Sequence, residues 1–200
     1  MANSYPERPC SRQRSSSPSL VALYIEGLHR GPRGDRNDTR LVVLRGPCGA
    51  GKSTVASRLL ESPRPTALIE QDPYRFIFNV RKGEMYSKTV RQMIRDNVLG
   101  ALGNGFDVIL EEILSTKGYR DVFATLFREH PRNNHLFYFD VSFDETVRRH
   151  RGRAKASLFT EADMRPWYRP RDVLGYDFER VIDEDSTLDD TVRLIRSAIA

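Results

Sequence analysis

Residues 41–54, LVVLRGPCGAGKST, constrain the fold of this 200-residue chain more than any other stretch. An apolar run typical of a buried strand precedes Gly46, Gly51, Lys52 and Ser53 in the pattern G-x-x-x-x-G-K-S/T, and an amphipathic helical segment begins at Lys52. Glycines at this spacing let the backbone curl until consecutive N–H groups converge, and the helix N-terminus adds its positive end. Because strand, glycines and helix come in the required order, the pattern predicts a phosphate-binding loop rather than a turn with an incidental lysine.

The same pattern predicts what individual residues of the loop do. Lys52 can reach the β- and γ-phosphates of a bound nucleotide, Ser53 can hold Mg²⁺ as the metal ligand, and Thr54 can cap the loop near the α-phosphate. Cys48 occupies a variable position of the loop. The residues expected to bind the nucleotide are Gly46, Cys48, Gly49, Ala50, Gly51, Lys52, Ser53 and Thr54.

After the loop, short apolar runs alternate with amphipathic segments of helical period. Strands are expected at residues 41–46, 66–70, 106–112, 135–140 and 179–183. Helices are expected at residues 52–60, 86–105 and 119–130, and a last helix is expected to begin with Ser186 or Thr187 as its cap. Strands that are apolar on both faces and alternate with helices indicate a parallel sheet covered on both sides. The predicted fold class is therefore α/β, with a five-stranded parallel sheet and helices on both faces.

The first 40 residues differ in composition from the rest of the chain. Segments such as SRQRSSSPS and HRGPRGDRNDTR are rich in Ser, Pro, Gly and Arg, and such segments cannot bury enough apolar surface to fold alone. We therefore expect a flexible extension at residues 1–40 and a single domain at residues 41–200.

Composition also limits the classes of function. The net charge of +5 suits phosphate-bearing ligands, but alone it does not indicate nucleic-acid binding. No apolar run approaches the roughly 20 residues that span a bilayer, and the N-terminus lacks the apolar core of a signal peptide, so we expect no membrane partner. Two cysteines, Cys10 and Cys48, cannot form a disulfide framework, which favours the cytoplasm.

The segment ALIEQDPYRF, residues 67–76, ends an apolar strand with Asp72 and Arg75. We expect this strand beside the one that feeds the phosphate loop, which would bring its carboxyl end close to the γ-phosphate. A carboxylate there can take the proton from an attacking hydroxyl, and Arg75 can hold an anionic or polar group of the acceptor. A structural role is compatible with this one, since Asp72 followed by Pro73 could also cap a short helix.

The motifs GPCGAGKST, QDPYR, ILEE and ETVRRHRGRAKASLFTEADMRPWYR together resemble the small P-loop kinases related to polynucleotide 5′-hydroxyl kinases, zeta toxins and chloramphenicol phosphotransferase. The resemblance covers nearly all of residues 41–196. It implies a P-loop NTPase fold, a helical lid at about residues 148–172, and ATP with Mg²⁺ as the nucleotide and metal. It also implies that Asp72 is the catalytic base and that Arg75 grips the acceptor.

The family's glutamate near the acceptor or the metal's water shell matches Glu111 by this resemblance, so Glu111 joins Arg75 as an expected acceptor-binding residue. The chain departs from the family pattern at Glu112, where relatives often have glycine. Because neighbouring residues of a strand point to opposite faces, only one of the two acids is expected in the site, and we expect a surface role for Glu112.

A basic segment follows the fourth expected strand and contains Arg148, Arg149, Arg151, Arg153 and Lys155. A solvated basic helix is the ordinary explanation of such a run, but small kinases carry their lid at this place. An arginine that closes over the transferred phosphoryl group stabilises its charge. By the resemblance, Arg149 and Arg153 join Asp72 and Lys52 as catalytic residues, and the register leaves Arg148 and Arg151 as alternatives. The nearby Arg165, Trp167 and Tyr168 either face the acceptor or pack the lid helix, and we favour packing for Trp167.

The function that these motifs favour is the transfer of the γ-phosphate of ATP to a hydroxyl of a small-molecule acceptor. A polynucleotide 5′-hydroxyl is the alternative acceptor, favoured by DPYR and by the arginine-rich extension. An alternative of another class is a non-catalytic nucleotide-binding switch, which would need neither Asp72 nor a basic lid. The loop around residues 183–186 is expected to contact the base, and the four His and two Cys show no metal-ligand spacing.

Overall fold

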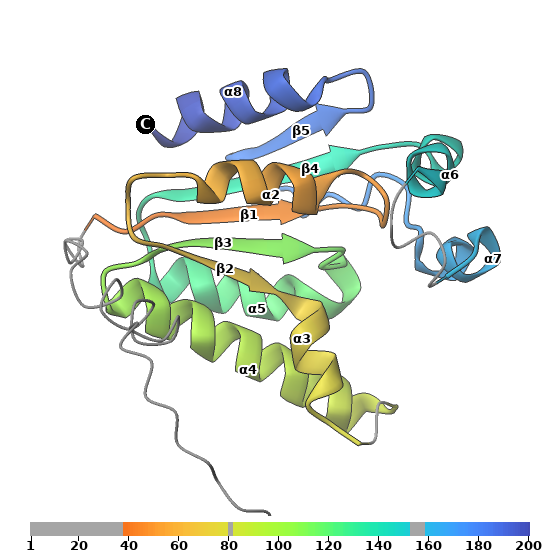
Figure 1. Ribbon diagram of the computed structural model, residues 1–200. Helices are drawn as coiled ribbons and strands as arrows, with labels where there is room; N and C mark the ends of the chain where they lie inside the picture. The colour runs from red at the N-terminus through yellow and green to blue at the C-terminus, as the bar shows by residue number, and fades with distance from the viewer. Residues whose placement is uncertain (1–37, 80–81, 153–158) are drawn as a thin grey trace, which may run out of the picture. The chain divides into compact units, whose positions relative to one another are not determined.

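Five parallel strands form one sheet in the order β2-β3-β1-β4-β5 (Figure 1). The computed structural model describes residues 38–79, 82–152 and 159–200, so most of the expected extension, together with Arg153 and Lys155, lies outside the described residues. The strands are β1 (Leu41–Arg45), β2 (Thr66–Glu70), β3 (Asp107–Glu112), β4 (Asn134–Asp140) and β5 (Glu179–Asp183). The predicted α/β class and its five parallel strands are confirmed, with bounds that differ by one residue at β1, β3 and β4.

At least one helix follows each strand. They are α2 (Lys52–Leu60), α3 (Gln71–Phe76), α4 (Glu84–Gly103), α5 (Thr116–Glu129), α6 (Phe143–Arg151), α7 (Glu161–Met164) and α8 (Leu188–Ile199), with a 3₁₀ turn η2 (Arg165–Trp167). Helix α2 has the predicted bounds, whereas α4 and α5 begin before the predicted residues. Of the two cap candidates for the last helix, Thr187 is the N-cap of α8, and its hydroxyl accepts a hydrogen bond from the backbone N–H of Asp190.

Helices cover both faces of the sheet (Figure 1). Helices α2 and α8 pack on one face, where Val42 and Leu44 of β1 are buried. Helices α4 and α5 pack on the other face, where Leu41 and Val43 are buried. Because both faces are covered, successive residues of β1 are all buried, and burial of each of its Leu and Val side chains contributes about 1.5–3 kcal/mol. The alternation also decides to which side each polar residue at the end of a strand points.

The expectation that the strand before Asp72 lies beside β1 is wrong. Strand β3 lies between β1 and β2, and residue pairs such as Leu44 with Glu111 and Glu70 with Glu111 give its register to both neighbours. The crossover from β1 to β2 passes over β3 and is filled by α2. As a consequence, the acids at the end of β3, on a strand next to β1, are closer in the sheet order to the phosphate loop than Asp72 after β2.

A buried arginine ends β1, directly before the phosphate loop. The Arg45 guanidinium pairs with Glu179 of β5 at 2.9 Å and with Asp172 at 3.1 Å. It also donates hydrogen bonds to the Leu114 carbonyl oxygen and to the Thr116 hydroxyl at the start of α5. These contacts join β1, α5, β5 and the segment after η2 at the edge of the sheet where the site lies.

Within the described ranges, no helix is long and apolar enough to cross a membrane.

Candidate active site

The loop between β1 and α2 has the conformation that its glycines predict. Gly46, Gly49 and Gly51 adopt φ values of 141°, 88° and 100°. A Cβ at Gly46 would lie 2.6 Å from the carbonyl oxygen of Phe139, and a Cβ at Gly49 would lie 2.7 Å from that of Thr146. The loop therefore passes so close to β4 and α6 that only glycine fits at these two positions.

The loop surrounds the Lys52 ammonium group. Lys52 is 5% exposed, and its Nζ donates hydrogen bonds to the carbonyl oxygens of Gly46 at 3.0 Å and Pro47 at 2.9 Å. The first turn of α2 carries neither a side-chain cap nor an acidic residue. The positive end of the helix and the ammonium therefore act together on the loop, and this set of donors fits a polyphosphate.

Ser53 at the start of α2 meets Glu111 at the end of β3. The Ser53 hydroxyl donates a hydrogen bond of 2.7 Å to Oε1 of Glu111, whose side chain is on the α2 face of the sheet and 4% exposed. Burial raises the pKa of Glu111, and Glu70 raises it further, whereas the Lys52 charge and the Ser53 hydrogen bond lower it.

A hydroxyl and a carboxylate are oxygen ligands of the kind that Mg²⁺ prefers, so Ser53 and Glu111 fit this ion. Among the described residues, no cluster of three His, Cys, Asp or Glu side chains could hold a metal.

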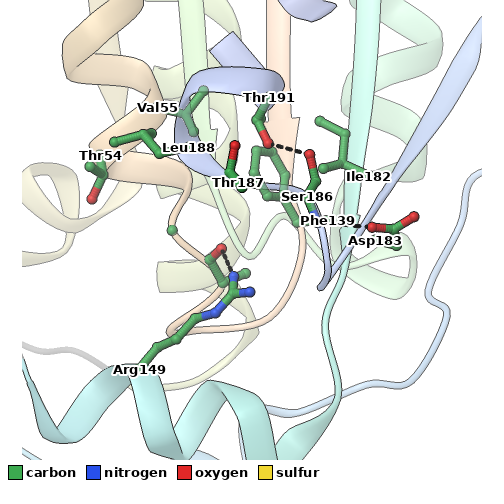
Figure 2. A pocket seen from close by; sticks show the side chains of 12 residues that line it. Thr54, Val55, Phe139, Arg149, Ile182, Asp183, Ser186, Thr187, Leu188 and Thr191 are labelled. Carbon is green, nitrogen blue, oxygen red and sulfur yellow. Dashed lines mark hydrogen bonds between the residues drawn. The ribbon is translucent and has the colours of Figure 1, made fainter.

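A cavity of about 310 Å³ lies beside the loop and is shown in Figure 2. Its apolar wall includes Phe139 and Ile182, and its other wall is the turn before α8. In that turn the Asp183 carboxylate accepts hydrogen bonds from the backbone N–H groups of Asp185 and Ser186. The segment expected to contact the base, residues 183–186, thus contributes to this cavity, and apolar faces next to polar groups suit a purine ring.

Arg149 of α6 lines the same cavity (Figure 2). Its guanidinium donates hydrogen bonds to the Ala50 carbonyl oxygen in the loop at 3.0 Å, to the Glu184 carbonyl oxygen at 2.7 Å and to Glu145 at 2.6 Å. Arg149 therefore joins α6 to the phosphate loop and to the turn before α8. Hydrogen bonds from Arg148 and Arg149 lower the pKa of Glu145 to about 2.

The other two arginines of α6 pair with acids outside the loop. The side chain of Arg148 is exposed and pairs with Glu145, and that of Arg151 is exposed and lies 3.8 Å from Glu161. Of the lid arginines that the structure describes, Arg149 is the one that reaches the loop. The second predicted catalytic arginine, Arg153, lies outside the described residues.

A larger cavity of about 660 Å³ lies at the carboxyl ends of β2 and β3. Residues of α3, α4, α5 and η2 line it, and so does Cys48 of the phosphate loop. Asp72 and Arg75 both line this cavity, and their side chains lie 3.6 Å apart. With its amide oriented to suit its neighbours, Gln71 accepts hydrogen bonds from Arg75 and donates one to the Tyr119 hydroxyl, which orients the arginine.

The structure corrects two expectations about acids of this cavity. Asp72 does not cap α3, because Glu70 is the N-cap residue and Asp72 lies within the first turn. Glu112 does not have a surface role, because its side chain points to the α4 and α5 face and lines the cavity. Burial raises the pKa of Glu112, as do the charges of Asp72 and Glu111, and the Lys52 charge lowers it. Both acids of the pair Glu111 and Glu112 therefore enter the site, from opposite faces of one strand.

Of the residues after α7 that could face the acceptor or pack, Trp167 does both. Its ring packs edge-on against Phe159, as expected, and it also lines the larger cavity with 45% of its surface exposed. Arg165 and Tyr168 do pack, since the Arg165 guanidinium lies 4.1 Å from the Phe143 ring centre and the Tyr168 hydroxyl donates to the Val141 carbonyl oxygen.

Sequence reasoning missed several residues of this cavity, among them Tyr86, Arg91 and Tyr119. A signal for Arg91 was available. Ser87 and Arg91 are four residues apart on α4, so they lie on one face of the helix, and the buried Val90 directly precedes Arg91.

Comparison with known proteins gives the family. The model of AAA_33, described as an AAA domain, matches residues 41–173, which is more than half of the chain. The chain belongs to the AAA_33 family. The match includes the phosphate loop, Asp72, Glu111 and Arg149. A search of curated protein sequences gave no match.

Solved structures that are similar to this chain include several kinases. The APS kinase CysC of Mycobacterium tuberculosis, solved with AMPPNP and APS, has a TM-score of 0.60 at 18% identity over 83% of this chain and 97% of that one. A gluconokinase from Sinorhizobium meliloti 1021 has a TM-score of 0.58 at 18% identity, and the match covers 82% of this chain and 93% of that one. A tunicamycin resistance protein of Deinococcus radiodurans has a TM-score of 0.58 at 15% identity, and the match covers 81% of this chain and 96% of that one. The AAA_33 domain of this chain therefore has a P-loop kinase-like fold.

Proposed function

We propose that this protein is an ATP- and Mg²⁺-dependent phosphotransferase that moves the γ-phosphate of ATP to a hydroxyl of a small-molecule acceptor. The observation that carries the proposal is that the two cavities share the phosphate loop. Ala50, Gly51 and Thr54 line the smaller cavity, and Cys48 lines the larger one. A donor in one cavity and an acceptor in the other would meet at the loop, whereas a nucleotide switch has no use for the second cavity.

The smaller cavity and the loop are the proposed ATP site. The base would lie against Phe139 and Ile182, and the phosphates would accept hydrogen bonds from the loop N–H groups and from Lys52. Ser53, together with Glu111, would hold Mg²⁺, which neutralises charge on the phosphate oxygens. The contacts of Arg149 with the loop support a role in stabilising the transferred phosphoryl group, and Arg153 stays a second candidate for that role.

The larger cavity is the proposed acceptor site. The acceptor hydroxyl attacks the γ-phosphorus, its O–H proton passes to the Asp72 carboxylate, and the bond from the γ-phosphorus to the bridging oxygen breaks with its electron pair going to ADP. Arg75, held by Gln71 and Asp72, would bind the acceptor. Glu112 is a second carboxylate that lines this cavity, and it would orient the acceptor hydroxyl.

The size of the cavity favours a small acceptor over a polynucleotide. A volume of about 660 Å³ is within the usual range of small-molecule sites. The likeness of DPYR to polynucleotide kinases keeps a 5′-hydroxyl end as the second acceptor to test. The likeness to zeta toxins and chloramphenicol phosphotransferase agrees with a small acceptor.

The test follows the γ-phosphate of labelled ATP into a fractionated metabolite extract and, in parallel, into a 5′-hydroxyl oligonucleotide. We expect label in a low-molecular-weight fraction, and a decrease of about 10²–10⁴-fold in kcat for Asp72→Asn with ATP affinity retained. Asp96→Asn, an exposed acid of α4, is the matched control and should transfer at the wild-type rate.

Label on the oligonucleotide alone would replace the small-molecule acceptor by a polynucleotide. If ATP binds and no pool accepts label, the protein is a nucleotide-binding switch and the proposed function is wrong. Transfer by Asp72→Asn at the wild-type rate would remove Asp72 as the base.

A further inference from the structure

The larger cavity contains more positive charge than its acids balance. Three arginines line it, Arg75 on α3, Arg91 on α4 and Arg169 after η2, against the two acids Asp72 and Glu112. Arg75 has Asp72 at 3.6 Å. The other two arginines have no such partner in the described part of the chain, although Nη1 of Arg169 donates to two carbonyl oxygens.

Arg91 is the most available of these cations. Its guanidinium forms no hydrogen bond or ion pair with any residue in the ranges 38–79, 82–152 and 159–200. It nevertheless is partly buried, on the face of α4 that carries Ser87 and Val90. A guanidinium that is partly withdrawn from water without a partner binds an anion more strongly than an exposed one does, and its fork of donors suits an oxyanion.

The same cavity has exposed aromatic faces. Phe76 is 64% exposed and Trp167 is 45% exposed, and both line it. Large rings that border a cavity lose unfavourable contact with water when another apolar group covers them, and a second aromatic ring adds a favourable ring contact. A ligand that satisfies both features of this cavity needs an apolar ring in addition to a negative charge.

We propose that the acceptor is a ring-bearing organic anion, whose oxyanion group binds Arg91 and whose ring packs on Trp167. Arg91 is then a specificity-determining residue, and Arg75 and Arg169 supply further positive charge in the same cavity. The inference rests on the proposed function, because it assigns the phosphate acceptor to this cavity. The hydroxyl that receives the phosphate belongs to the same molecule and lies at the Asp72 end of the cavity.

The test uses Trp167, the chain's single tryptophan, as the probe of its own cavity. The full chain is saturated with Mg²⁺ and a non-hydrolysable ATP analogue, so that the phosphate loop is occupied. Phenyl phosphate and phenol are then titrated at constant ionic strength while the tryptophan fluorescence is recorded. We expect a saturable response to phenyl phosphate and an affinity for phenol at least about tenfold weaker.

Two variants separate Arg91 from general charge effects. Arg91→Gln should weaken the binding of phenyl phosphate about tenfold or more and leave the affinity for phenol unchanged, because a charge-assisted hydrogen bond is lost. Arg95→Gln is the matched control: it is on the same helix, pairs with Asp96, and should bind both probes as the wild type does. Melting temperatures show that both variants are folded.

Equal affinity for phenol and phenyl phosphate would overturn the anionic part of the inference. Unchanged binding of phenyl phosphate in Arg91→Gln would overturn the assignment to Arg91, and no fluorescence response to either probe would overturn the ring contact with Trp167. Calorimetry of the ATP analogue keeps the two proposals apart. Failure of the analogue to bind defeats the kinase proposal, whereas failure of the probes alone defeats only this inference.

Discussion

Glu111 and Glu112 show at the scale of single residues how one strand supplies both halves of the site. Glu111 contacts Ser53 on the α2 face, and Glu112 lines the acceptor cavity on the opposite face. Their pKa values are both raised, with burial as the largest cause. Groups with raised pKa values in a cleft are typical of functional sites, and burying a charged carboxylate there lowers the stability of the fold.

Glu112→Gln should therefore stabilise the protein in a pH-dependent way. The folded state raises the pKa of Glu112 above 4.5, so the folded protein holds this proton more tightly than the unfolded chain. Stability is then lost as the pH rises from the ordinary carboxyl pKa through the raised pKa of the folded state. Glutamine removes this loss, so the variant should melt at a higher temperature than the wild type at about pH 8, with a smaller gain at about pH 4. Thermal unfolding at both pH values measures the gain in melting temperature. An equal gain at both would contradict the raised pKa of Glu112 as its cause.

At the scale of elements, the Arg45 cluster holds the edge of the sheet from which both cavities are built. The guanidinium is buried between Glu179 of β5 and Asp172, and Asp172 also accepts a hydrogen bond from the backbone N–H of Thr116 at the start of α5. The segment that carries Trp167 is thereby fixed to the strand that carries the phosphate loop. A buried pair does not by itself add stability, but removing one partner leaves charge without compensation.

Arg45→Leu should accordingly lower the free energy of unfolding by about 3–5 kcal/mol, because two carboxylates lose their cation. Urea unfolding measures the loss. Arg58→Leu is the control, since 43% of its side chain is exposed and its pairs with Glu61 and Asp189 should contribute less than about 1 kcal/mol. If Arg45→Leu lowers the free energy of unfolding as little as Arg58→Leu does, the Arg45 cluster does not hold these elements together.

Which segments form helices and strands could be predicted from the sequence, but the order of the strands in the sheet could not. Apolar runs and helical periods predicted all five strands and the bounds of α2, because these patterns depend on local geometry. The position of β3 between β1 and β2 depends on crossover connections, which no local pattern encodes. The same limit explains Glu112: the alternation of the strand was predicted correctly, but which segments enclose a cavity around its side chain depends on long-range packing.

At the scale of the whole molecule, the proposed ATP site is made of segments far apart in sequence. The loop after β1, Arg149 of α6, the end of β5 and the turn before α8 all line one cavity (Figure 2). A ligand that contacts all of them binds only when they are assembled. It therefore stabilises the folded protein as a whole, by mass action.

A non-hydrolysable ATP analogue with Mg²⁺, present at about 100 times its dissociation constant, should raise the free energy of unfolding by about 2.7 kcal/mol. For a domain of this size that corresponds to a rise in melting temperature of roughly 5–10 °C. Lys52→Ala should abolish most of this rise, because the buried ammonium in the loop is lost. Lys88→Ala, an exposed lysine of α4, should keep it. Thermal unfolding with and without the analogue tests this, and a full rise in Lys52→Ala would mean that the nucleotide binds elsewhere than at the phosphate loop.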